Sequence, residues 1–360
     1  MLVSRVVLIG FSWFTTVSAI PVFSFNNQAT GDSFPQVANP SNELTNISVQ
    51  AHGTLPNTPP PANSPSDNSK TSLKLIAFNE LFEVAFFTEL LKNITNNVTG
   101  YEIGGAEGER RFMINALKAV KAQEELHVLN ANGVLTHFGG SAIEPCEYNF
   151  PVSNVNDAIM LAQTFTDVVL GTLQDVVSLF GTGGDAALIR GVSSVIGQEG
   201  EQNGWYRTFL GKIPSALPFL TTSTREFAFS AIQGFVVPGS CPSLSSIDLQ
   251  IFPPLNVNTS PIEDKEQDLK FSVTVENADS WKSDFSITYI NQQNIPINTP
   301  IKDVNMVGNM VTFTANFPYN ASTFGNGLTL AAVTNSTGSF ASASDVANVT
   351  VFGPGLIEVN

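Results

Sequence analysis

Residues Met113 to Val134 read MINALKAVKAQEELHVLNANGV, and the spacing of apolar residues in this stretch predicts the fold. Successive members of one stripe lie four and three residues apart, which is the core-facing pattern of a helix in a bundle. Glu124 and His127 lie inside that stripe. Burying a carboxylate and an imidazole is costly unless each has a partner or a metal ion. The members of the stripe are Met113, Leu117, Val120, Glu124, His127, Ala131 and Val134.

Three further segments repeat this spacing, and each has polar residues near its middle. In an antiparallel bundle these interruptions meet at one level, so we predict one interior cluster formed by Glu80, Glu83, Glu124, His127, Thr166, Glu199 and Gln202. The three stripes are Leu73, Ile76, Glu80, Glu83, Phe87 and Leu90; Ile159, Ala162, Thr166, Val169, Leu173, Val176 and Phe180; and Val192, Val195, Glu199, Gln202, Tyr206 and Phe209.

The chain divides into four regions by composition. Residues 1–19 have the basic residue, apolar run and small-residue cleavage site of a signal peptide. Residues 20–70 are rich in Pro, Asn and Ser without periodicity, which predicts a disordered tether. Residues 71–245 carry the helical stripes. Residues 246–360 alternate apolar and polar positions in short runs, which predicts an antiparallel β-sandwich, with an immunoglobulin-like fold as one option.

Several features place the protein outside the cell or in the cell wall. Seven glycosylation sequons follow the predicted signal peptide, and no later apolar run has membrane-spanning length. The formal net charge of −15 argues against a nucleic-acid partner. Cell-wall or matrix components are candidate partners. The sequon asparagines are Asn46, Asn93, Asn97, Asn258, Asn320, Asn335 and Asn348.

The chain has two cysteines, Cys146 and Cys241. In an oxidising compartment the simplest expectation is one disulfide between them, with two buried free thiols as the alternative.

Four segments resemble the fungal secreted members of the ferritin-like superfamily, which are described as stress-response and sexual-development proteins. The resemblance covers residues 71–245 and implies a ferritin-like four-helix bundle. It does not define an activity. The segments are NELFEVAFF at 79–87, QEELH at 123–127, FTDVVLG at 165–171 and GQEGEQNGWYR at 197–207.

The metal ligands of this superfamily are one Glu from each of two helices and Glu-x-x-His from each of the other two. Glu80, Glu124, His127 and Glu199 match this pattern. Thr166 and Gln202 occupy the positions of the second single Glu and the second His, and Asp167 is rotated about 100° away from the vacant position. Glu83 is an additional carboxylate that could substitute as a ligand. A degenerate site of this kind could hold iron, manganese or another divalent metal.

Two hypotheses follow for function. The first is a secreted metal-binding or oxidative-stress protein that uses Glu80, Glu83, Glu124, His127 and Glu199 as ligands. The second is a non-catalytic extracellular protein in which the cluster is a vestige held by hydrogen bonds. A di-iron oxidase or peroxide-handling enzyme is a weaker option, since two ligand positions are substituted. We expect no ferritin-type cage, because glycans and a second domain would crowd the outer surface.

Overall fold

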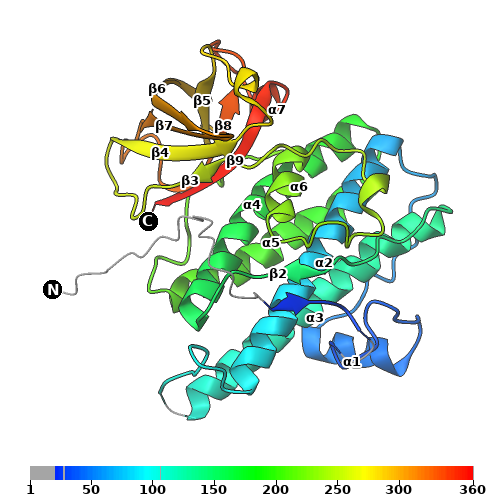
Figure 1. The fold of residues 1–360 in the computed structure, drawn as a ribbon. Helices are drawn as coiled ribbons and strands as arrows, with labels where there is room; N and C mark the ends of the chain where they lie inside the picture. The colour runs from blue at the N-terminus through cyan, green and yellow to red at the C-terminus, as the bar shows by residue number, and fades with distance from the viewer. Residues whose placement is uncertain (1–20, 27–28, 106, 360) are drawn as a thin grey trace.

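The computed structural model describes residues 21–26, 29–105 and 107–359. The predicted signal peptide therefore lies outside the described residues. Four long helices form the centre of the first domain (Figure 1). Helix α2 (Asp67–Thr95) packs along α3 (Glu107–His137), and α4 (Val155–Thr182) packs along α5 (Ala186–Phe209). Contacts between α2 and α4 join the two pairs into a bundle, as the stripes predicted.

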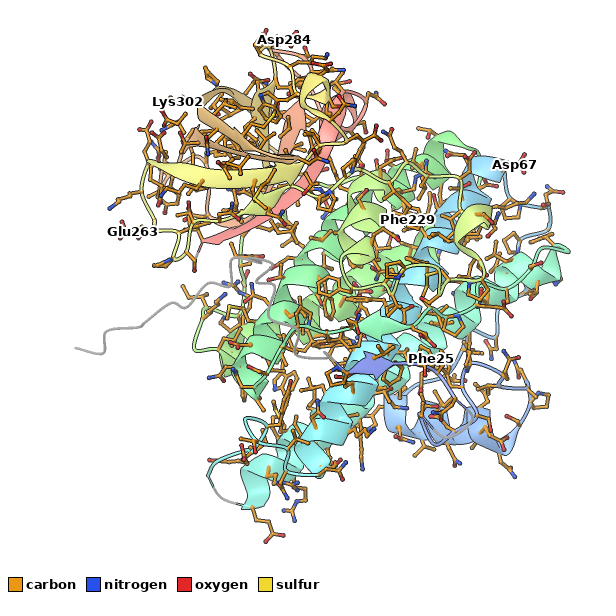
Figure 2. All side chains as sticks on the ribbon, in the orientation of Figure 1. Phe25, Asp67, Phe229, Glu263, Asp284 and Lys302 are labelled. Atoms are coloured by element: carbon orange, nitrogen blue, oxygen red, sulfur yellow. A yellow bond between two sulfur atoms is a disulfide. The ribbon has the colours of Figure 1, made fainter. Side chains whose placement is uncertain are left out.

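The middle of α2 is buried all round, because other elements cover it on several sides. The short helix α6 (Arg225–Gln233) closes one of these sides. Phe229 of α6 is fully buried between the helices (Figure 2), and its ring lies 5.2 Å from that of Phe78. No helix in the described part of the chain combines the length and hydrophobicity needed to cross a membrane.

The prediction of a disordered tether is wrong for the described part of residues 20–70. Strand β1 (Val22–Phe23) pairs with β2 (Tyr148–Asn149), and α1 (Asn42–Ala51) packs against α3. Composition gave no sign of this order, because few apolar residues provide it. Ile47 and Phe34 are almost completely buried, and they fix the segment to the bundle.

The crossover between α3 and α4 is joined to the end of the domain by the predicted disulfide. Cys146 and Cys241 are bonded, which confirms the pairing. Tyr148 of β2 also forms a bridge with Val236, just after α6. The crossover is therefore held by a covalent bond and by backbone pairing.

The second domain is one antiparallel seven-stranded sheet, nearly barrel-shaped, rather than the predicted sandwich (Figure 1). Its order is β3-β4-β7-β6-β5-β8-β9, and the end strands β3 and β9 lie next to each other. The long strand β6 explains the difference. Its first residues pair with β5 and its later residues pair with β7, so one strand continues both halves of the sheet. The strands are β3 (Asn256–Val257), β4 (Gln267–Thr274), β5 (Ser286–Asn291), β6 (Ile297–Val307), β7 (Met310–Phe317), β8 (Gly327–Thr334) and β9 (Thr350–Val359), with α7 (Ala343–Ala347) before β9.

The two domains share an apolar interface. Strand β8 is buried on both faces: Ala331 and Val333 face the interior of the sheet, whereas Leu328 and Leu330 pack in a cluster with Phe227 of α6. The alternating apolar residues of this strand predicted one buried face. That face, with Leu328 and Leu330, packs against the helical domain.

We expect the double substitution Cys146→Ala and Cys241→Ala to lower the free energy of unfolding by about 2–5 kcal/mol, because the bond closes a loop of 95 residues. Chemical denaturation followed by circular dichroism measures this loss. An unchanged denaturation midpoint would contradict the proposed role of the bond in holding the crossover.

Candidate metal centre

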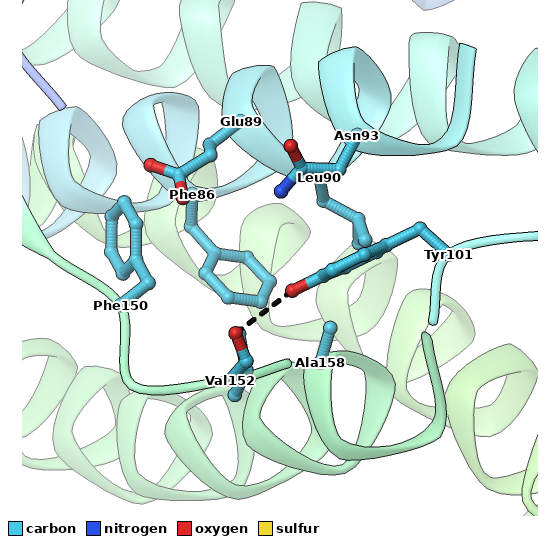
Figure 3. Close-up of a pocket in the computed structure, with 8 residues that line it drawn as sticks. All are labelled: Phe86, Glu89, Leu90, Asn93, Tyr101, Phe150, Val152 and Ala158. Atoms are coloured by element: carbon cyan, nitrogen blue, oxygen red, sulfur yellow. Dashed lines mark hydrogen bonds between the residues drawn. The ribbon is translucent and has the colours of Figure 1, made fainter. Parts of the chain in front are cut away.

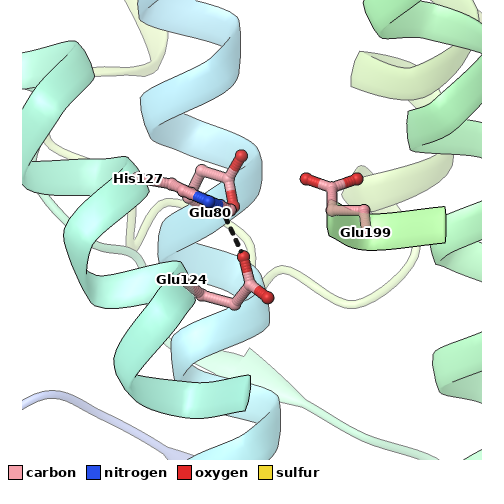
Figure 4. Close-up of side chains that lie close together, drawn as sticks. All are labelled: Glu80, Glu124, His127 and Glu199. Atoms are coloured by element: carbon pink, nitrogen blue, oxygen red, sulfur yellow. Dashed lines mark ion pairs between the residues drawn. The ribbon is translucent and has the colours of Figure 1, made fainter. Parts of the chain in front are cut away.

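Three helices bring four predicted ligand residues to one place in the bundle. Glu80 is on α2, Glu124 and His127 are on α3, and Glu199 is on α5. One nitrogen or oxygen atom from each lies within 4.8 Å of those from the other three. Figure 4 shows Glu199 reaching the group from the side opposite to the other three. The mid-helix interruptions of three stripes thus meet at one level.

The polar atoms of this cluster face one another with few hydrogen bonds. His127 Nδ1 lies 2.8 Å from Glu124 Oε2 and 3.4 Å from Glu80 Oε2, but neither contact has the alignment of a hydrogen bond. Both carboxylate oxygens of Glu80 and both of Glu199 have no hydrogen-bond partner among the described residues. Buried polar atoms are nearly always paired, so this cluster has unused ligand capacity.

Burial dominates the proton equilibria of the cluster. Burial raises the pKa of Glu80 to about 7, against a partial lowering by His127. Burial also raises the pKa of Glu199 well above its usual value, and the nearby Glu80 and Glu124 raise it further. The pKa of His127 is raised well above its usual range because the attraction of Glu124 and Glu80 outweighs burial. Without a cation the cluster therefore holds protons at neutral pH.

Glu83 lies beside the four-residue group and is fully buried. Its Oε1 accepts a hydrogen bond of 2.9 Å from Asn79 Nδ2, and burial, followed by the charges of Glu124 and Glu199, raises its pKa well above the usual value. Thr166 is buried on α4, and its hydroxyl has no hydrogen-bond partner.

Gln202 touches the cluster in place of a second histidine. Its Nε2 donates to Glu124 Oε1 at 2.6 Å and to Gln123 Oε1 at 3.1 Å. Gln123 Oε1 also accepts a bond from Gln198, so a glutamine network joins α3 to α5. Sequence reasoning missed Gln123, although it lies directly before Glu124.

Tyr206 is a second residue whose position sequence reasoning did not predict. It lies on the apolar stripe of its helix, yet its hydroxyl donates to Gln202 Oε1 at 3.4 Å. Burial raises its pKa well above the usual value, and the charges of Glu124 and Glu83 add to the effect. The only available signal was its place on the stripe, four residues after Gln202.

Asp167 does not join the cluster, as its helical position predicted. It lies on the side of α4 that faces α5 and the second domain, where its Oδ1 accepts from Asn203 at 2.8 Å. Burial raises the pKa of Glu358 on β9 well above its usual value, and the nearby charge of Asp167 raises it further. This second buried acidic group belongs to the domain interface.

A comparison with protein-family models agrees with this geometry. Residues 71–212 match the ferritin-like domain family. The chain contains a ferritin-like domain. The matched region includes Glu80, Glu124, His127 and Glu199. A comparison with curated proteins found no match.

A cavity elsewhere in the ferritin-like domain differs from the candidate metal centre in its mainly apolar lining (Figure 3). It lies towards the end of α2 and is lined by Phe86, Glu89, Asn93 and Tyr101, among others. Tyr101 donates its hydroxyl proton to the carbonyl of Val152 at 2.9 Å. The lining is mainly apolar and offers a single carboxylate, so it does not form a second metal site.

We expect the metal-free protein to lose stability as the pH rises from about 4.5 to 7. The folded state keeps Glu80 protonated up to a pKa of about 7, whereas the unfolded chain releases that proton near 4.5. The folded state therefore binds more protons across this window, and the raised pKa of Glu80 contributes on the order of 3 kcal/mol of stability at low pH that is lost at high pH. Thermal unfolding in the presence of a chelator measures the trend.

The variant Glu80→Gln is the control for this pH dependence. It keeps the shape of the side chain without the titration, so its melting temperature should fall less over the same pH window. A steeper fall in the variant, or a wild-type stability that rises from pH 4.5 to 7, would contradict the assignment.

Proposed function

We propose that this protein is a secreted or cell-wall ferritin-like glycoprotein that binds a divalent metal ion between α2, α3 and α5. The observation that carries this proposal is the set of buried, unbonded ligand atoms on Glu80, Glu124, His127 and Glu199. Iron and manganese are the favoured ions, because both accept mixed carboxylate and imidazole ligands.

The charge of the site fits a cation. The three carboxylates and one imidazole share a space from which water is largely excluded, and two or more ionised carboxylates there repel one another. A divalent ion would replace the shared protons and use the free oxygens. His127 is the best placed to meet an entering ion, since 15% of its side chain is exposed and the three carboxylates are buried.

The substituted positions favour one ion over two. Gln202 donates a hydrogen bond to Glu124 where a second imidazole would otherwise coordinate a metal, and Thr166 brings a hydroxyl where a bridging carboxylate would stand. Glu83 can supply a further oxygen only if it gives up its bond to Asn79. Two-metal redox chemistry is therefore the weaker proposal.

A structural role without metal is the second candidate function. The bond of 2.6 Å from Gln202 to Glu124 supports it, because this amide already satisfies one ligand oxygen and joins two helices. In this case shared protons would neutralise the cluster, and the bundle would act as a rigid extracellular module.

The extracellular setting and a role in stress or development remain parts of the proposal. The disulfide is compatible with an oxidising compartment. Six of the seven sequon asparagines are exposed, which suits glycosylation, whereas Asn93 is half-buried at the cavity of Figure 3. We expect glycans at the six exposed positions before Asn93. Those positions are Asn46, Asn97, Asn258, Asn320, Asn335 and Asn348.

Metal binding is tested by the pair of variants Glu199→Gln and Glu201→Gln. Glu199 is buried in the cluster, whereas Glu201 is exposed on the same helix. We expect Glu199→Gln to weaken Mn²⁺ binding at least about tenfold and Glu201→Gln to leave it unchanged. Titration calorimetry on protein purified without a metal-binding tag measures both affinities.

The melting temperature separates the two candidate functions. If the site binds metal, Mn²⁺ should raise it, a chelator should lower it, and Glu199→Gln should abolish both effects. If the site is a proton-sharing vestige, Mn²⁺ and chelator should have no effect in any of the three proteins, and metal binding would be rejected.

A further inference from the structure

A second buried group of charged side chains lies on another face of α3, where the N-terminal segment covers it. Lys121 Nζ is 2.7 Å from Glu125 Oε1 and 3.1 Å from Asp32 Oδ2. The exposed fractions of the three side chains are 6% for Lys121, 0% for Glu125 and 6% for Asp32. One amine and two carboxyl groups are therefore enclosed together, on a face of α3 away from the candidate metal centre.

This group is larger than an ordinary ion pair. A single amine faces two carboxyl groups, and Glu125 Oε2 has no hydrogen-bond partner in the described chain. The surroundings offer little solvation, since Ala122 and Leu126 of α3 pack here with Ile47 of α1. Removing ions from water costs several kcal/mol each, so loss of two of the charges would relieve a substantial penalty.

We propose that Lys121 and Asp32 join in an intramolecular amide (isopeptide) bond, with Glu125 as the proton carrier. Glu125 first relays one proton from the Lys121 ammonium to the Asp32 carboxylate, which frees the Nζ lone pair and leaves a neutral carboxylic acid. The lone pair attacks Cγ of Asp32, a C–N bond forms, and the C–O bond to the hydroxyl group breaks. Glu125 relays a second proton from Nζ to the leaving hydroxyl, which departs as water. The ammonium and the carboxylate thereby become a neutral amide and one water molecule, and Glu125 ends in its starting state.

The N-terminal segment holds Asp32 in a position suited to this reaction. The backbone N–H of Phe34 donates to Asp32 Oδ1 at 3.4 Å, which leaves Oδ2 directed at Lys121. Gly31 and Ser33, on either side of Asp32, both have positive φ angles, of 81° and 61°. A serine in this left-handed region is kept there by its surroundings. Reacting groups held this close avoid most of the entropic cost of meeting.

The bond would attach the segment around Asp32 permanently to α3, within one turn of Glu124 and within two turns of His127. The segment and α1 would then remain over this face of the helix. This inference does not depend on metal binding, because none of its three residues is a proposed ligand.

Peptide mapping tests the proposal on the full-length secreted protein. Cleavage after glutamate in denaturant gives one peptide that ends at Glu43 and contains Asp32, and another that spans residues 110–124 and contains Lys121. We expect these two peptides to run as one species, with their summed mass less one water, and fragmentation to place the link on Lys121 and Asp32. Two separate peptides of unmodified mass in the wild-type protein would overturn the proposal.

Two variants test the chemistry. Lys121→Arg should release both peptides, and Glu125→Gln, which keeps the side-chain shape, should reduce the linked species at least tenfold. The exposed pair of Lys70 and Asp67, with Nζ and Oδ1 3.2 Å apart, is the matched control and should give no link in any sample. A link at this exposed pair as well would show nonspecific cross-linking and would also overturn the proposal.

Discussion

The structure depends on the burial of carboxylates and an imidazole at the centre of a helical bundle. Each of these groups would be more stable in water, and the bundle can hold them only if protons, hydrogen bonds or a cation compensate. Glu80, Glu124 and Glu199 have few hydrogen bonds, and burial raises the pKa of Glu80 and of Glu199. This constraint therefore allows two states of the same site. In one state the carboxyl groups share protons, and in the other they bind a metal ion.

The same constraint explains the arrangement of the surrounding elements. The glutamine network of Gln123, Gln198 and Gln202 joins α3 to α5 at the level of the cluster, and Gln123 also donates to the carbonyl of Ala51 at the end of α1. The N-terminal segment, the bundle and the ligands are thus connected through one short stretch of α3. Because that stretch also carries Lys121, changes in this helix should affect both buried charged groups.

Periodicity predicted the helices and the place where they meet, because a stripe of apolar residues fixes which side chains face inwards. Glu80, Glu124, His127 and Glu199 could be assigned to one cluster on that basis alone. Periodicity did not predict the ordered N-terminal segment, since few apolar contacts there, such as that of Ile47, hold it in place. It also could not distinguish a sandwich from a nearly closed sheet, because the difference lies in how β6 divides its hydrogen bonds between β5 and β7.

The most direct test of the central claim is a crystal structure of the protein with Mn²⁺, measured at a wavelength where manganese scatters anomalously. We predict one anomalous peak in contact with His127 Nδ1 and with oxygens of Glu80, Glu124 and Glu199. Density that shows these side chains bonded directly to one another, with no anomalous peak between them at saturating Mn²⁺, would contradict the account.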